Sequence, residues 1–66
     1  MQNKPLIEQL SIHIDLLVKL RLVLDTEVVR QVRFTTAERS GASMMLVGCD
    51  YLIENLSTLR AAIALK

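Results

Sequence analysis

Apolar side chains recur at intervals of three and four residues over the first half of the chain, the spacing of one face of an α-helix. This apolar arc contains Leu6, Ile7, Leu10, Ile14, Leu17, Val18, Leu24, Val28, Val29 and Val32. The opposite side of the same helix carries Glu8, Asp15, Lys19, Thr26, Arg30 and Arg33. The pattern predicts an amphipathic helix over about residues 5–33, opened by Pro5, because the first helical turn tolerates proline.

Apolar and polar residues also alternate in twos within this segment, which is typical of a β-strand. The alternation runs from Ile12 to Leu16 and from Val18 to Leu22, and it slips between these two runs. The helical pattern is several times longer, so it is the preferred interpretation. A strand over residues 16–24 is the alternative.

The second half of the chain carries another helical pattern and contains no proline. Its apolar arc is formed by Ala42, Met45, Cys49, Leu52, Ile53, Leu56 and Ile63, and its polar side by Arg39, Ser43, Asp50, Glu54 and Ser57. The pattern predicts a second helix over about residues 36–65. Two helices of similar length joined by a short link form an antiparallel hairpin, so the fold class is all-α with a single domain over residues 1–66.

The link between the helices is marked by a capping signal. Thr35 and Glu38 have the spacing of a capping box, in which each side chain bonds the backbone N–H of the other residue. This predicts the turn at residues 33–36. The alternative is a turn at residues 39–43, with Gly41 ending the first helix.

Each predicted helix carries a second apolar stripe beside its main arc. The first helix adds Ile12, Leu16, Leu20 and Val23, and the second adds Met44, Gly48, Tyr51, Leu59 and Ala62. A hairpin buries one stripe per helix, so the second stripes need a partner. We expect a homodimeric four-helix bundle. The residues expected at its interface, or at the contact with another protein, are Ile12, Leu16, Leu20, Val23, Met44, Gly48 and Tyr51.

Composition limits the remaining choices. The 66 residues are 52% hydrophobic but only 3% aromatic, so the core is aliphatic, and the net charge is +1. One cysteine, Cys49, allows no internal disulfide, and with His13 it supplies too few ligands for zinc. No signal peptide is visible, and no uncharged run approaches the ~18 residues of a membrane span. The expectation is a soluble cytoplasmic protein without a membrane partner.

Catalytic signatures are absent from the sequence: it has no glycine-rich phosphate loop, no nucleophile motif and no carboxylate pair at catalytic spacing. We therefore expect no enzymatic activity, no cofactor and no metal. His13 is expected at the boundary of the apolar arc and Cys49 inside it. Arg21 falls within the arc, with Asp25 one turn later, and is expected either to form a polar pair there or to extend past its edge.

Three arginines, Arg30, Arg33 and Arg39, are predicted to gather near the hairpin turn, where they could contact an anion or nucleic acid. Glu27 and Glu38 offset part of this charge. The leading hypothesis is therefore a small non-enzymatic protein–protein interaction module, an adaptor, chaperone-like or regulatory factor that acts as a homodimer. A nucleic-acid-binding hairpin dimer that uses the three arginines is the alternative.

Overall fold

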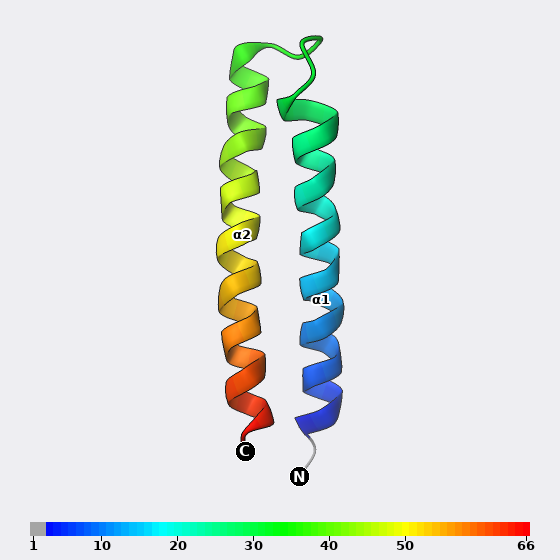
Figure 1. Ribbon diagram of the computed structural model, residues 1–66, viewed down its shortest axis with the longest axis vertical. Helices are drawn as coiled ribbons and strands as arrows, with labels where there is room; N and C mark the ends of the chain where they lie inside the picture. Colours follow the sequence, from blue (N-terminus) through cyan, green and yellow to red (C-terminus); the bar gives the residue numbers. More distant parts are fainter. Residues whose placement is uncertain (1–2) are drawn as a thin grey trace.

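Two long helices run side by side in opposite directions in the computed structural model, which describes residues 3–66 (Figure 1). Helix α1 spans Asn3–Leu24 and continues into a π-helical turn, η1, at Asp25–Val29. Helix α2 spans Thr36–Ala64. No strand occurs among the described residues, so the all-α prediction is confirmed and the alternative strand over residues 16–24 is wrong.

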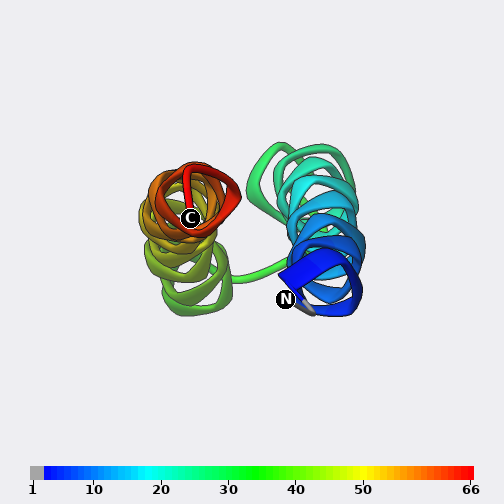
Figure 2. The ribbon, with the colours of Figure 1, turned by 90° about the horizontal axis from the view of Figure 1, so that it is seen from below.

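The hairpin is a single layer of two helices, a rod of 51 × 14 × 11 Å in which the start of α1 and the end of α2 lie at the same end (Figures 1 and 2). Helix α1 begins two residues earlier than expected, at Asn3. Pro5 still lies in the first turn, where the backbone N–H that proline lacks has no intrahelical partner.

The buried side of each helix is one narrow stripe, here called the seam. Its members on the first helix, buried or half-buried, are Ile7, Leu10, Ile14, Leu17, Arg21, Leu24 and Val28. On α2 they are Arg39, Ala42, Leu46, Cys49, Ile53, Leu56, Arg60 and Ile63. The steps alternate between three and four residues, which is the seven-residue repeat that keeps two helices facing each other along their length.

The predicted apolar arcs were wider than the seam. The structure leaves five of their members exposed: Leu6, Val18, Val32, Met45 and Leu52. The reason is geometric, because two isolated helices cover only the two positions per repeat that face the neighbour. Flanking residues that point partly sideways stay in contact with water.

The best-buried part of the seam lies near the turn. Leu24, Ala42 and Cys49 are 8%, 3% and 5% exposed, and Val28 and Val29 pack against them. Ile14 is the only other buried side chain among the described residues. The hairpin therefore has a very small interior for its length.

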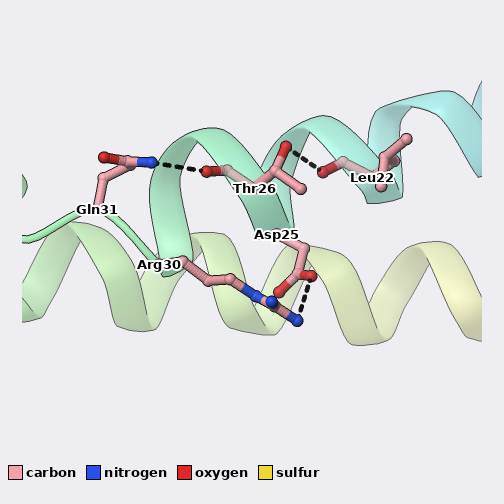
Figure 3. A network of polar contacts seen from close by, with 5 residues as sticks. All are labelled: Leu22, Asp25, Thr26, Arg30 and Gln31. Carbon is pink, nitrogen blue, oxygen red and sulfur yellow. Dashed lines mark hydrogen bonds and ion pairs between the residues drawn. The ribbon is translucent and has the colours of Figure 1, made fainter.

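The π-helical turn η1 explains how two successive valines both reach this cluster. The backbone N–H of Arg30 donates to the carbonyl oxygen of Asp25 at 3.2 Å, five residues back, which widens the turn. Asp25 and Arg30 consequently lie on the same side, and their side chains form an ion pair at 3.1 Å (Figure 3).

Local hydrogen bonds end the first helix earlier than the predicted residue 33. Thr26 Oγ1 donates to the carbonyl oxygen of Leu22 at 2.9 Å, and Gln31 Nε2 donates to the carbonyl oxygen of Thr26 at 3.0 Å (Figure 3). The backbone N–H of Gln31 donates to the carbonyl oxygen of Val28 at 3.1 Å. These bonds use carbonyl groups at the helix end, and helical geometry stops at Val29.

The chain reverses direction over residues 30–35, and the predicted capping box then opens α2. Thr35 Oγ1 accepts the backbone N–H of Glu38 at 3.1 Å, and Glu38 Oε1 accepts that of Thr35 at 2.8 Å. Gly41 lies inside α2, so the alternative turn at residues 39–43 is wrong. The hydrogen bond from the Thr35 backbone N–H to the carboxylate favours an ionised Glu38, and the pKa of Glu38 lies below the usual value, chiefly because of this N–H and then because of the Thr35 side chain.

We predict that burial in the seam dominates the stability of the hairpin. Leu24→Ala is expected to lower the free energy of unfolding by about 2–4 kcal/mol, because it empties the best-packed region. Leu22→Ala is the matched control, because Leu22 is 59% exposed two residues away. Urea unfolding followed by circular dichroism at one protein concentration measures both variants. Equal losses of stability would contradict the assignment of the seam.

We also predict that Glu38 makes stability depend on acid pH. Its folded-state pKa is lowered, so its contribution is present above the unfolded-state pKa of about 4.3 and is lost as the pH falls through the folded-state value. Glu38→Gln keeps an acceptor for the Thr35 N–H but cannot titrate. Urea unfolding at a series of pH values from 6 down to 3 should show a smaller loss of stability in this variant than in the wild type. Parallel pH profiles would exclude a role for this carboxylate.

Candidate interaction face

The hairpin has two broad faces, one on each side of the plane that contains both helices. Two contacts between side chains of α1 and α2 lie on the first. The Arg21 guanidinium forms an ion pair with Asp50, and Arg60 Nη1 donates to Ser11 Oγ at 2.9 Å. The residues that flank the seam here define the polar face: Ser11, Val18 and Asp25 on the first helix and Ser43, Asp50 and Ser57 on α2, of which only Val18, 49% exposed, is apolar.

The opposite face carries aliphatic side chains. In a seven-residue repeat the two positions that flank the seam point to opposite sides, and antiparallel helices bring equivalent flanks to the same face. The large side chains and the glycine of this second face, the apolar face, are Leu6, Leu16, Leu20, Val23, Met45, Gly48, Leu52 and Leu59. His13 and Glu27 lie on the same line of the first helix, seven residues before and after Leu20. The seven large side chains of the apolar face are between 47% and 57% exposed. No other part of residues 3–66 covers them.

The two interhelical contacts define the register between α1 and α2, that is, which residues of the two helices lie at the same height along the rod. Arg21 is level with Asp50, and Ser11 is level with Arg60. The same register sets Leu20 level with Tyr51 and Leu52. Leu20 and Leu52 therefore mark the middle of the apolar face.

The residues predicted for an interface divide into two groups. Leu16, Leu20, Val23 and Gly48 lie on the apolar face. Ile12, Met44 and Tyr51 lie on the backs of the helices at its edges, and Met44 and Tyr51 are 77% and 67% exposed.

Sequence reasoning missed Leu6, Met45, Leu52 and Leu59 as members of an interface. Leu6, Met45 and Leu52 were assigned to the buried arcs, and Leu59 was left out of the interface set. The strict alternation of three- and four-residue steps is the signal that separates them from the seam.

Small residues line the outer edge of the apolar face on α2. Gly41, Gly48, Asn55 and Ala62 follow one another at seven-residue intervals, so they form one line along the helix. A Cβ atom added at Gly41 or Gly48 would meet nothing within 4 Å, and neither glycine has a positive φ angle. Packing and backbone conformation within the hairpin therefore do not require glycine at either position.

The three arginines near the turn have three different surroundings. Arg30 is paired with Asp25, and the Arg33 guanidinium lies 4.8 Å from the centre of the Phe34 ring. Arg39 is half-buried at the seam, and its Nε atom is buried without a hydrogen-bond partner. Arg30 and Arg33 thus have local contacts, whereas Arg39 is turned toward the seam.

The remaining candidate residues have local roles. Arg21 lies at a seam position as expected, but its partner is Asp50 of the other helix and not Asp25. His13 Nδ1 lies 2.7 Å from the carbonyl oxygen of Gln9 on the exposed surface. Cys49 is a buried free thiol.

Three kinds of site are not found in residues 3–66: an enclosed pocket, a group of three or more potential metal ligands, and a helix long and apolar enough to cross a membrane. Comparisons with protein-family models, with curated proteins and with solved structures found no match to this chain.

Proposed function

We propose that the protein is a small non-enzymatic interaction module that binds helical protein surfaces through its apolar face and acts as a homodimer. The observation that carries this proposal is the apolar face, where seven large aliphatic side chains from both helices stay about half exposed. Contiguous apolar patches of this kind on a soluble chain mark sites of association.

The contrast between the two faces supports a specific surface. The polar face has its own partners, Arg21 with Asp50 and Arg60 with Ser11. The apolar face carries no charged side chain near its middle, where Leu20 and Leu52 lie, and Asn55 lies one turn from Leu52 at its outer edge. Covering such side chains is favourable by roughly 25 cal/mol for each Å² of apolar surface removed from water.

The shape of this face favours helices as its partners. It runs along two helices that lie side by side, and helices added along such a face complete a four-helix bundle. Its side chains are aliphatic, which suits the interdigitated packing of helical bundles. Self-association is the simplest way to supply two more helices.

Contacts with a different protein would then fall on the edges of the bundle. Met44 and Tyr51 are strongly exposed there and lie on the back of α2. Methionine adapts to varied partners, and tyrosine combines an apolar ring with a polar hydroxyl group. An adaptor, chaperone-like or regulatory role would use these residues for the second protein.

Nucleic-acid binding through Arg30, Arg33 and Arg39 has weaker support. Arg30 is neutralised by Asp25, and the Arg39 Nε atom is buried. A phosphate-binding surface requires cations that are directed outward. The apolar face is the stronger basis for a function.

We predict that Leu20→Glu disrupts association, because it places a charge in the middle of the apolar face. The measurements are solution mass by multi-angle light scattering and helicity by circular dichroism. The dissociation constant of the dimer should rise by at least 100-fold, since burying an unpaired carboxylate costs several kcal/mol.

The matched control is Leu22→Glu, because Leu22 is an exposed leucine of the same helix on the other side of the hairpin. It should leave the mass of the protein unchanged. If both variants keep the wild-type mass and helicity, the apolar face is not the site of association.

A further inference from the structure

We infer that the apolar face is occupied by a second copy of this chain packed antiparallel, so that α1 lies on α1, α2 lies on α2, and the two turns point to opposite ends of a four-helix bundle. This inference rests on the proposed function, to which it adds the partner and its orientation. It follows from the exposed surface area and from the charges along the apolar face.

The excess exposed surface of the hairpin is about the area that one partner buries in a dimer. The hairpin exposes 5071 Å², whereas a compact monomer of its mass exposes roughly 4200 Å². The excess of roughly 900 Å² is close to the ~800 Å² that each partner buries in a complex of standard size. The hairpin is a thin rod in which four side chains of the described residues are buried, and this shape accounts for the excess.

Two two-fold arrangements bring the apolar faces together. If the two-fold axis runs along the rod, both turns lie at one end and α1 packs on α2 of the other copy. If the axis runs across the rod, the turns lie at opposite ends and each helix packs on its own counterpart.

The line of residues on α2 that borders the seam distinguishes these arrangements. Within α2 it reads Glu38, Met45, Leu52, Leu59 at seven-residue intervals, and Lys66 follows seven residues later, two residues beyond the end of α2. Glu38 lies about 21 Å from Leu52 along the helix at 1.5 Å per residue, and Lys66 lies 14 residues from Leu52 on the other side. A two-fold axis across the rod at Leu52 therefore sets Glu38 of one copy opposite Lys66 of the other.

The corresponding line on the first helix has the same symmetry. His13 and Glu27 lie seven residues on either side of Leu20, with Glu27 in the π-helical turn η1, and Leu20 is level with Tyr51, one residue from Leu52. One two-fold axis near Leu20 and Leu52 thus sets Glu27 of one copy opposite His13 of the other. The same axis sets Glu38 of one copy opposite Lys66 of the other. Two independent lines of residues share one centre of symmetry.

The arrangement with both turns at one end lacks this complementarity. It brings the Glu27 and Glu38 carboxylates of both copies together at the turns, beside Arg30, Arg33 and Arg39, and both Lys66 side chains together at the other end, so neither line of the apolar face pairs a carboxylate with a cation of the same line. Like charges brought together at an interface oppose association. The antiparallel arrangement separates the carboxylate pairs by about the length of the rod.

The small residues of α2 fit the same geometry. In an antiparallel pair of α2 helices centred between Tyr51 and Leu52, half a residue from the centre that pairs Glu38 with Lys66, Gly48 comes opposite Asn55 and Gly41 opposite Ala62. Small residues on both sides let the two backbones approach closely. This gives a role to the two glycines that the hairpin itself does not require.

Spin-label distances between the two copies test the orientation. Cys49→Ala removes the native thiol, and single cysteines are then placed by Ser40→Cys or Glu54→Cys, both at exposed positions of α2 away from the apolar face. Ser40 lies 12 residues from Leu52 and Glu54 lies two. In an antiparallel dimer the Ser40 labels are separated by about 36 Å along the axis and the Glu54 labels by about 6 Å, with the width of the bundle added in both cases.

Double electron–electron resonance should therefore give a clearly longer distance for the Ser40→Cys label than for the Glu54→Cys label. Similar short distances at both positions would overturn the antiparallel arrangement and leave the homodimer intact. A monomer in light scattering of the wild-type chain would overturn the proposed homodimer and this inference together.

A charge variant tests the same geometry with Cys49 in place. Lys66→Glu should weaken the dimer roughly 3–10-fold, because it opposes Glu38 of the second copy at two symmetric places. Lys19→Glu, on the back of the first helix, should leave the dissociation constant unchanged. Equal effects of the two variants would contradict the contact between Glu38 and Lys66.

Discussion

The width of the contact between two helices is the constraint on which the rest of this structure depends. A helix that faces a single neighbour covers two positions of each seven-residue repeat, and here those positions form the seam. The chain carries aliphatic residues well beyond them, so much of its apolar surface remains exposed. Only four side chains of residues 3–66 are buried, and the single cysteine allows no internal disulfide, so a hairpin of this size has few sources of stability within itself.

The polar residues at the seam determine which face of the hairpin is polar and which is apolar. Arg21 and Arg60 occupy seam positions where an aliphatic residue would pack, and both extend toward the polar face to reach Asp50 and Ser11. Their charged groups therefore leave the apolar face aliphatic around Leu20 and Leu52. An exposed ion pair adds little stability, so its main consequence is to fix which side of the hairpin is polar and how the helices are aligned.

Much of the fold could be predicted from the sequence, because helix periodicity and the capping box at Thr35 and Glu38 are local signals. The end of the first helix could not, because the π-helical turn forms where Val28 and Val29 both pack against the other helix. The pairing of Arg21 with Asp50 depends on the register between helices, which no local pattern contains. Leu52 and Met45 were misplaced because a broad apolar arc does not distinguish a seam residue from its flank, whereas the exposed fractions do.

The central claim is that the apolar face is covered by association and that the hairpin depends on this cover. The most direct test is light scattering of the wild-type chain across a dilution series, with helicity followed at each concentration by circular dichroism. We predict a mass of twice 7.4 kDa at high concentration, and a loss of helicity as the dimer dissociates on dilution. A monomer that keeps its full helicity at every concentration would contradict the account, because the apolar face would then remain exposed in a stable protein.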